Sequence, residues 1–307
     1  MIKNMYTVTD LFCGAGIGAM GFKNVFDINY AVDNNQYAVD TYIKNIKFNA
    51  VCKDIRKLKS SDIPNSDVII GGFPCKPFSV AGSGKGVHDE KNGDLSLQFM
   101  RIVNDKRPKA FVIENVAGLV SKKHCAFFNF LIQSFENMGY IVKFKLMNLS
   151  DYGIPQDRKR VFVVGIHNDN FEFPNTLPKK TLYDAIHDLP IPAKKYESFN
   201  HYEYYDGGFS SRYISRNRQR QWNEQSFTIV SCARQLPLYP SPANYDIRKT
   251  QINPPRRFTV RECLRIQSVP DTFCFDVNIP LAKQYERCSG IPSLFAENLA
   301  KQVEKYL

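Results

Sequence analysis

A cysteine set between two prolines is the residue of this chain best suited to covalent chemistry. The segment Pro74-Cys75-Lys76-Pro77 follows the apolar run Asp67–Gly71, so Cys75 is predicted to lie on a loop just after a buried strand. A thiolate is a good nucleophile when nearby positive charge lowers the pKa of its thiol, and Lys76 could supply that charge or contact a phosphate. The alternative is a structural cysteine at a turn, because buried free cysteines are common.

An acid and an amide stand at the end of another apolar run. Glu114 and Asn115 follow Ala110–Ile113, which is typical of a buried strand. A carboxyl group partly removed from water holds its proton more readily, so Glu114 could act as an acid or a hydrogen-bond donor. Asn115 could orient a neighbouring loop. The alternative for Glu114 is an acid that caps a helix or forms a salt bridge.

Two arginines precede the apolar run Val161–Ile166 at alternating positions. Because side chains of a strand alternate between its two faces, Arg158 and Arg160 should point the same way. Two aligned guanidinium groups suit a phosphate or a base oxygen. The alternative is a solvated basic edge.

The segment Asp10–Ala19, with the sequence DLFCGAGIGA, is a glycine-rich turn between a strand and a helix. Gly14 and Gly16 would let a ligand approach the backbone closely. Asp33 ends the next strand, where a carboxylate can bond a ribose hydroxyl, and Asp54 after the third strand could bond an adenine amino group. These features suit any cofactor that contains adenosine. The turn alone does not separate NAD from S-adenosylmethionine, because its spacing also matches the dinucleotide pattern.

The elements that must position these residues alternate between strand and helix. The predicted strands are short apolar runs: Thr7–Phe12, Asn29–Asp33, Asp67–Gly71, Ala110–Glu114, Ile141–Met147 and Val161–Ile166. The predicted helices lie between them: Gly18–Val25, Gln36–Asn45, Leu95–Asp105 and Ala126–Met138. This alternation favours a mainly parallel sheet covered on both faces. Ligands in such sheets lie at the carboxyl ends of the strands, where the candidate residues fall.

The pattern changes after about Phe173, where prolines interrupt the chain. The segment from Tyr202 to Asn253 is rich in Tyr, Arg, Asn, Gln and Ser, and helical periodicity returns at Val260–Gln267 and Ala296–Leu307. We therefore predict a large catalytic and cofactor-binding domain, residues 1–175 completed by 280–307. A small target-recognition domain with a hinge is predicted for residues 176–279.

A basic stretch lies in the predicted small domain. Ser215–Trp222 has three arginines at alternating positions, and no acidic residue occurs from 207 to 223. Arg234 follows a predicted strand at Ser226–Ser231. Arginine bonded to guanine O6 and N7 is the commonest specific base contact. The alternative is general phosphate binding, which accounts for most contacts between proteins and DNA.

The bulk composition is that of a globular protein with an anionic partner. The chain has 307 residues, a formal net charge of +11 and a pI near 9.2, which suggest nucleic acid or a membrane surface unless the charge serves solubility alone. No run approaches the roughly 18 apolar residues needed to span a bilayer, so no membrane span is expected. The first residues, MIKNMYTVTDLF, lack the long apolar stretch that is typical of a signal peptide. The eight cysteines are scattered without a Cys-x-x-Cys pair, so neither a metal site nor a disulfide framework is expected. Reduced cysteines fit a cytoplasmic enzyme.

Taken together and in this order, the motifs resemble the cytosine-C5 DNA methyltransferase family over nearly the whole chain. The segments that carry the resemblance are DLFCGAGIG, GGFPCKPFS, ENV, QDRKRVF and RRFTVRECLRIQSVPD. Each is weak alone, but five in order at family-like spacing are highly specific and disfavour NAD. The resemblance implies an α/β fold of the Rossmann-like, S-adenosylmethionine-dependent methyltransferase type, with a mixed, mainly parallel sheet and a smaller target-recognition domain.

The resemblance also implies a role for each candidate residue. Cys75 is the nucleophile that adds to C6 of a cytosine flipped out of the duplex. Glu114 engages N3 and the exocyclic amine of the base, and Arg160 lies near its O2 with Arg158 as a structural companion. Addition of the thiolate lets C5 attack the sulfonium methyl group, and loss of the C5 proton and the thiolate restores the ring. The implied cofactor-binding positions are Phe12, Gly14, Gly16, Asp33, Asp54 and Ile55.

The basic stretch is similar to the recognition region of family members that methylate GGCC. They share the pattern SRNR-x-RQWNE, followed by a Thr-Ile/Val strand and Arg-Gln. On that basis Arg216, Arg218 and Arg234 read guanines. Lys76 and Ser79, in the segment that carries Cys75, are also expected to contact DNA. Ala233 stands where those enzymes tend to have glycine.

The chain departs from the family pattern in three places. Lys76 replaces a usual Gln, Asn92-Gly93 replaces an Arg-Gly pair, and Gly290-Ile291-Pro292 is two residues shorter than Gly-Asn-Ala-Val-Pro. The short C-terminal motif supports one alternative, a catalytically silent DNA-binding homologue. A second alternative is an RNA (tRNA) cytosine-C5 methyltransferase, because one branch of the family acts on tRNA. The expected protein is a monomeric enzyme of a bacterial restriction–modification system, which uses S-adenosylmethionine and double-stranded DNA, with no metal and no membrane partner.

Overall fold

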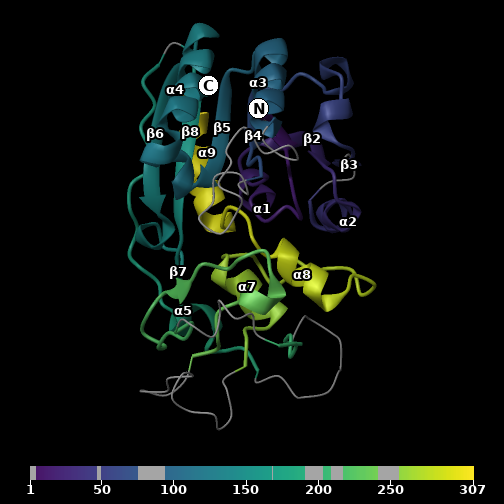
Figure 1. The fold of residues 1–307 in the computed structure, drawn as a ribbon, viewed down its shortest axis with the longest axis vertical. Helices are drawn as coiled ribbons and strands as arrows, with labels where there is room; N and C mark the ends of the chain where they lie inside the picture. The colour runs from purple at the N-terminus through teal and green to yellow at the C-terminus, as the bar shows by residue number, and fades with distance from the viewer. Residues whose placement is uncertain are drawn as a thin grey trace.

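A seven-stranded sheet with the strand order β3-β2-β1-β4-β5-β8-β6 forms the centre of the larger part of the molecule (Figure 1). The structure is a computed structural model and describes residues 5–46, 50–74, 94–167, 169–190, 203–208, 217–240 and 256–307. The first five strands run parallel, whereas β8 is antiparallel to β5 and β6. The strands are β1 Thr7–Leu11, β2 Asp27–Asp33, β3 Ala50–Cys52, β4 Val68–Gly71, β5 Ala110–Val116, β6 Ile141–Asn148 and β8 Lys159–Ile166. The predicted Rossmann-like fold with a mixed, mainly parallel sheet is therefore confirmed.

The first strand lies in the middle of the sheet, with β2 on one side and β4 on the other. Since the strand order reverses there, the connections after β1 and β4 leave toward opposite sides and open a crevice at the carboxyl ends of both strands. All residues of β4 are buried, as expected for a parallel strand covered on both faces. The topology thus places the glycine-rich turn and the segment before Cys75 side by side.

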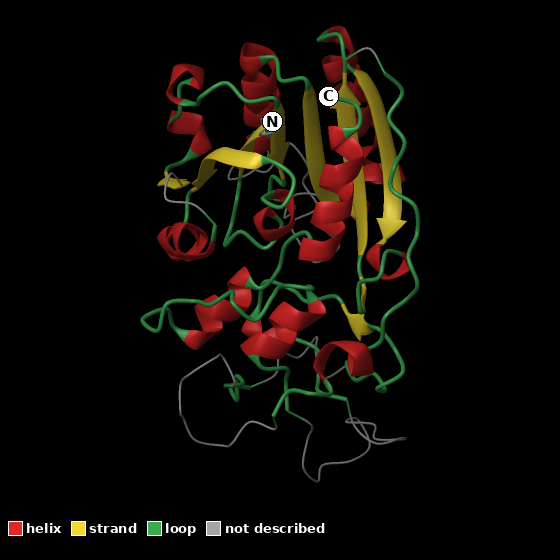
Figure 2. Cartoon of the chain, turned by 180° about the vertical axis from the view of Figure 1, so that it is seen from behind, coloured by secondary structure: helices red, strands yellow, loops and turns green. Residues whose placement is uncertain are grey.

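Helices cover both faces of the sheet. One face carries α1 (Ala19–Phe22), α2 (Gln36–Asn45) and α9 (Ser293–Glu304), whose apolar side chains belong to one buried cluster. The other face carries α3 (Leu95–Lys106) and α4 (Cys125–Asn137), which belong to a second cluster. In Figure 2, seen from behind, α9 lies in front of the strands beside the C-terminus.

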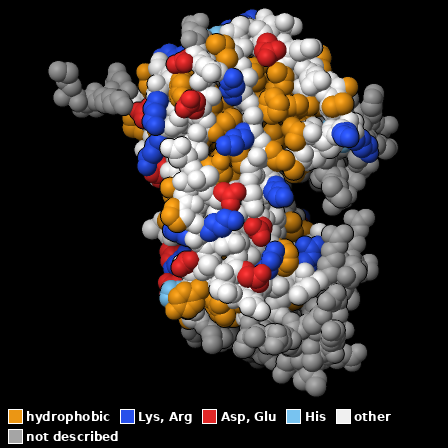
Figure 3. Space-filling model, turned by 90° about the vertical axis from the view of Figure 1, so that its left-hand side faces the viewer, with side chains coloured by type: hydrophobic (Ala, Val, Ile, Leu, Met, Phe, Trp, Pro, Cys, Tyr) orange, Lys and Arg blue, Asp and Glu red, His pale blue; other side chains and the backbone are white. Residues whose placement is uncertain are grey.

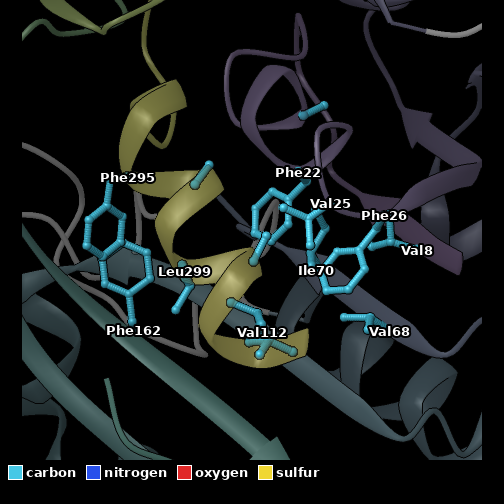
Figure 4. Close-up of a cluster of buried hydrophobic side chains, with 14 of the residues drawn as sticks. Val8, Phe22, Val25, Phe26, Val68, Ile70, Val112, Phe162, Phe295 and Leu299 are labelled. Carbon is cyan, nitrogen blue, oxygen red and sulfur yellow. The ribbon is translucent and has the colours of Figure 1, made fainter. Parts of the chain in front are cut away.

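The C-terminal helix α9 is part of the main core although it is far from β1 in the sequence. Figure 4 shows Phe295 and Leu299 of α9 directed toward the sheet, with Phe162 of β8 beside Phe295. The two ring centroids are 4.8 Å apart. On the α1 side, a Cβ atom at Gly21 would lie only 2.1 Å from the Ser293 carbonyl oxygen, so the two helices can approach this closely only with glycine at that position.

A smaller part lies below the sheet in Figure 1. It contains α5 (Leu182–Ile186), α7 (Val260–Ile266) and α8 (Leu281–Arg287). A short parallel pair, β7 (Gln156–Asp157) with β9 (Ser226–Phe227), joins it to the residues before β8. Its buried cluster also includes Ala15 and Ile17 of the glycine-rich turn and Met20 of α1. The division into domains 1–175 with 280–307 and 176–279 remains a prediction.

Several predicted elements differ from the observed ones in extent. The helix predicted at Gly18–Val25 is limited to α1, and the helix predicted at Ala296–Leu307 is α9, which begins and ends three residues earlier. The strand predicted at Ser226–Ser231 is only β9, because beyond it the Ile229 amide bonds a side chain, that of Gln156, instead of a neighbouring strand. Helix α5 was not predicted, although Thr181 and Asp184 form a capping box that signals its start.

The edge strand β6 exposes hydrophobic side chains. Phe144 and Leu146 of β6 and Phe130 of α4 are each about half exposed, and Figure 3 shows a hydrophobic patch on this side of the molecule. Lys143 and Lys145 alternate with them along the strand. Charged side chains on an edge strand oppose pairing with another chain.

Among the described residues, no helix is long and apolar enough to cross a membrane, and no cluster of His, Cys, Asp or Glu suits a metal ion.

Candidate active site

A pocket lies at the carboxyl ends of β1, β4 and β5, where the strand order reverses. Its lining includes Glu114, Arg158 and Arg160 together with Phe12 and Gly14, so it unites predicted catalytic residues with predicted cofactor positions. Further wall residues come from β4 and its following segment and from a stretch before α9: Gly71, Gly72, Phe73, Pro74, Ser289, Gly290 and Ile291. Cys75, Lys76, Ser79 and Arg216 lie outside the described residues.

Glu114 is held by both predicted arginines. The Nε atom of Arg160 is 2.9 Å from Glu114 Oε1, and Nη2 of Arg158 is 3.6 Å from the same oxygen. The side chains are largely buried, with 15% of Glu114 and 3% of Arg158 exposed. The prediction that the two arginines point the same way is therefore confirmed. The carboxylate also lies over Gly72, where a Cβ atom would be 3.3 Å from Glu114 Oε2.

Asn115 fixes the segment that leads to Cys75. Its Nδ2 donates a 3.2 Å hydrogen bond to the carbonyl oxygen of Phe73, and only 1% of the side chain is exposed. Pro74, the residue bonded to Cys75, lines the pocket. The prediction that Asn115 orients a neighbouring loop is confirmed by this bond.

A second pocket adjoins the first one. Phe12, Gly72 and Pro74 line both, and the second pocket adds Asp33, Asp54 and Ile55 among its walls. Five of the six predicted cofactor positions therefore line the two pockets. The Asp54 carboxylate bonds the backbone amide and guanidinium of Arg56. These bonds hold the pKa of Asp54 below its usual range.

The glycines of the turn have different surroundings. Gly14 has φ +54°, lines the first pocket and has no atom within 4 Å of where its Cβ would lie. Gly16 has φ +87°, and its Cβ would lie 2.8 Å from Cγ1 of Ile46 and 3.0 Å from a ring carbon of Tyr42. Gly14 thus leaves room for a ligand, whereas Gly16 lets the turn pack against α2.

Asp33 joins the turn to the end of β2. Its Oδ2 accepts a hydrogen bond from the Gly14 amide at 3.0 Å, and its Oδ1 accepts one from the Asn35 amide at 2.9 Å. Burial raises the pKa of Asp33, and the two amide hydrogen bonds and Arg287 act in the opposite direction. A carboxylate in this place, beside a pocket, suits the hydroxyl groups of a ribose.

Asp10 is a further acid in the pocket wall to which sequence reasoning gave no role of its own. It is 6% exposed, and the Tyr42 hydroxyl donates a 3.1 Å hydrogen bond to its Oδ2. Burial raises the pKa of Asp10 to about 7, and the nearby charge of Asp33 acts in the same direction. A charged residue inside the otherwise uncharged strand Thr7–Leu11 was the signal in the sequence.

The described residues of the predicted recognition region lie in the smaller part. The carbonyl oxygen of Arg218 accepts a hydrogen bond from the Leu238 amide, and Arg234 is exposed in a 3-10 turn that follows the Ile229 segment. Arg220, the third alternating arginine, has internal partners instead. It pairs with Asp157 at 3.3 Å and Glu224 at 2.8 Å, and its guanidinium stacks on Phe227.

Comparison with known families identifies the class of protein. Residues 6–305 match the family of C-5 cytosine-specific DNA methylases. The chain belongs to this family. It is therefore a DNA methyltransferase that acts on carbon 5 of cytosine, as the motifs implied.

Full-length relatives and solved structures agree with this membership. The type II methyltransferase M.MthTI of Methanothermobacter thermautotrophicus is 42% identical, with 98% of this chain and 97% of the relative covered. M.FnuDI of Fusobacterium nucleatum, also a type II methyltransferase, is 40% identical, with 97% and 94% covered. The structure of the Entamoeba histolytica methyltransferase EhMeth is similar in fold, with a TM-score of 0.74 at 16% identity over 99% of both chains.

Membership in this family implies a methyl donor and a substrate. Such enzymes generally take their methyl group from S-adenosylmethionine, and the substrate that the family description names is DNA. The short C-terminal motif, which includes Gly290 and Ile291, belongs to the wall of the first pocket. Ser289, Gly290 and Ile291 all line this pocket. A Cβ atom at Gly290 would lie 3.0 Å from Cβ of Ile17, so this motif packs directly on the glycine-rich turn.

Proposed function

We propose that this DNA methyltransferase modifies cytosine by covalent catalysis from Cys75, with Glu114 and Arg160 binding the base. The observation that carries the proposal is the shared pocket: Glu114, Arg160, Gly14 and Pro74 line one cavity, and Pro74 is bonded to Cys75. A base in this cavity must leave the duplex stack, because its ring carbons are otherwise inaccessible.

Each residue has a defined task in the proposed reaction. The Cys75 thiolate forms a bond to C6 of the cytosine, and the ring electrons move toward C5. Glu114 acts as an acid that donates its proton to N3 as the thiolate adds, and it accepts a hydrogen bond from the exocyclic amine. Arg160 holds both the Glu114 carboxyl group and the O2 edge of the base. The fixed ion pair between them costs no reorganisation during the reaction. After methyl transfer, loss of the proton from C5 expels the thiolate and restores the aromatic ring.

The two adjoining pockets fit S-adenosylmethionine, which when bound supplies an electrophilic methyl carbon on its sulfonium. Asp33 is placed to bond the ribose, and Asp54 and Ile55 border the place for the adenine. The open space beside Gly14 leaves room for the methionine part near Glu114. Phe12 and Pro74 line both pockets and would contact the cofactor where it passes from one pocket to the other.

The proposed target is a short duplex site, with GGCC as the sequence favoured by the pattern of the recognition region. Arg216, Arg218 and Arg234 are the proposed guanine readers, and Lys76 and Ser79 the proposed contacts beside the nucleophile. The exposed position of Arg234 supports its part of this assignment. The names of the relatives as type II methyltransferases support a place in a restriction–modification system.

Bisulfite sequencing of DNA from cells that express the protein tests the reaction and the site together. We expect protected cytosines within GGCC and none with Cys75→Ser. A serine variant that protects cytosine as fast as the parent would exclude Cys75 as the nucleophile. Protection at another sequence would exclude GGCC.

Single arginine variants separate base reading from phosphate binding. Arg218→Ala and Arg234→Ala should each cost roughly 1–3 kcal/mol of binding and relax one base position. An equal loss on all duplexes would instead identify a phosphate contact.

Two further measurements address the alternatives. Methylation of duplex DNA is compared with methylation of tRNA, and a preference for tRNA would contradict the proposal. Calorimetry with S-adenosylmethionine tests the catalytically silent alternative, which requires intact DNA binding without cofactor binding.

A further inference from the structure

Two buried glutamine side chains bond each other between the sheet and the smaller part. Gln156 of β7 and Gln267, which follows α7, are both fully buried. Nε2 of Gln156 donates a 3.1 Å hydrogen bond to Oε1 of Gln267. The methylation chemistry proposed above uses neither residue, and they are 111 positions apart in the sequence.

The Gln156 end of the pair holds the chain that leads to the proposed recognition residue Arg234. Its Oε1 accepts a 2.9 Å hydrogen bond from the Ile229 amide. The carbonyl oxygen of Ile229 accepts a 3.3 Å bond from Nη1 of Arg158, whose Nη2 lies 3.6 Å from Glu114. Both backbone polar groups of Ile229 are therefore held by side chains from the segment that leads to the active site.

The Gln267 end holds the wall of the first pocket. Its Nε2 donates a 2.9 Å hydrogen bond to the carbonyl oxygen of Cys288, the residue just before Ser289 of the pocket lining. The backbone carbonyl oxygen of Gln267 accepts a 3.0 Å hydrogen bond from the amide of Ser293, the first residue of α9. The packing of α9 against α1 thus fixes the same glutamine.

These hydrogen bonds form one buried path from Ile229, in the segment that leads to Arg234, to Cys288 at the wall of the first pocket. In both side chains, the amide oxygen accepts one of these bonds and the amide nitrogen donates another, so turning either amide over would break two bonds. A buried polar group that loses its partner destabilises the folded state. Small displacements of Ile229 are therefore resisted at Arg158 and, through the two glutamines, at Cys288.

We propose that Gln156 and Gln267 are positioning residues that couple DNA recognition to cofactor binding. When the Ile229 segment is placed on its DNA site, one position of Arg158 beside Glu114 is favoured. One position of Cys288–Ile291 in the wall of the first pocket is favoured as well. The inference rests on the proposed role of the segment carrying Arg234 in reading DNA. Coupling of this kind is reciprocal, so bound DNA should raise cofactor affinity by the same factor as bound cofactor raises DNA affinity.

The test measures the affinity of the full-length enzyme for S-adenosylhomocysteine by calorimetry, with and without a duplex that contains the methylated site. We expect the wild-type ratio of the two affinities to be about 5-fold or more, within the usual range of allosteric coupling. Gln156→Met and Gln267→Met should bring the ratio to within about twofold of one. The affinity for S-adenosylhomocysteine without DNA should change less than the affinity with DNA. The double variant should lose no more coupling than the stronger single variant, because both residues act in one path.

The control is Gln284→Met, which removes a different amide hydrogen bond, to the Ile279 carbonyl oxygen. It should keep the wild-type ratio. Gln267→Glu is the second variant if the methionine variants do not fold, because it keeps the acceptor for Gln156 and loses the amide donor to Cys288. An unchanged ratio in folded Gln156 or Gln267 variants, or the same loss in Gln284→Met, would overturn the inference.

The failure of this inference differs from a failure of the proposed function. Wild-type enzyme that methylates without site preference contradicts the proposed recognition role and removes the premise. Wild-type enzyme with normal site preference and no coupling, or with coupling that survives in the variants, contradicts only the role of the glutamine pair.

Discussion

Arg160 and Glu114 form an ion pair inside the active-site pocket, with Nε of Arg160 2.9 Å from Oε1 of Glu114. The pairing follows from the antiparallel contact of β5 and β8, which puts Glu114 opposite Phe162 and brings Arg160 opposite Val116. The carboxylate is thus oriented before any base enters. Such fixed charges are more effective in catalysis than groups that must first reorient.

Glu114→Gln should lower kcat by about 100-fold or more, since a positioned acid–base group contributes about 10²–10⁴-fold. The variant keeps the shape of the side chain, so affinity for S-adenosylhomocysteine should stay within about twofold. Single-turnover methylation assays and calorimetry measure the two effects. Lys159→Gln, an exposed neighbour of Arg160, is the control. Retention of more than a tenth of the activity in Glu114→Gln would contradict its role.

Asn115→Ala should reduce kcat by about 10–100-fold, because it removes the hydrogen bond to Phe73 that fixes the chain next to Cys75. Unfolding by urea should show a loss of about 1–3 kcal/mol for the orphaned carbonyl group. Asn24→Ala, which removes an exposed hydrogen bond to Glu297, should leave both quantities nearly unchanged. A stability loss without a fall in kcat would limit Asn115 to a structural role.

The two glycines of the turn should respond differently to alanine. Gly16→Ala should cost about 1–3 kcal/mol of stability, because φ is +87° and the new Cβ would press on Ile46 and Tyr42. Gly14→Ala should cost about 1–2 kcal/mol for its φ of +54° but meets no neighbouring atom. The new methyl group of Gly14→Ala would occupy the pocket. The loss in cofactor binding free energy should therefore exceed the loss in free energy of unfolding. Equal effects of both variants on stability and affinity would argue against this difference.

Asp10→Asn should stabilise the protein in a pH-dependent way, measured by urea unfolding without cofactor. Burial raises the pKa of Asp10 from 3.8 to about 7, so between these values the folded state keeps a proton that the unfolded state has lost. Stability therefore falls as the pH rises through this window, by a total on the order of a few kcal/mol. Asparagine cannot ionise and removes the loss. The gain should be small near pH 4 and largest at pH 8; a gain independent of pH would contradict ionisation as the cause.

The sequence by itself determined the sheet and the identity of the catalytic candidates. Apolar runs such as Val68–Gly71 must be buried, and the residues that follow them, including Pro74 and Asn115, must then reach the same edge of a parallel sheet. Local spacing also fixed the common direction of Arg158 and Arg160. These features depend on neighbours in the chain or on strand periodicity, which a sequence displays directly.

Only the tertiary structure decided which distant groups meet. Nothing in the spacing of Gln156 and Gln267 indicates that their amides bond each other, and the alternating arginines gave no sign that Arg220 pairs internally with Asp157. The raised pKa of Asp10 likewise depends on its burial in the folded chain, which the hydrogen bond from Tyr42 of α2 only partly opposes. Buried polar contacts between segments far apart in the chain follow from how whole elements pack, and no local pattern encodes them.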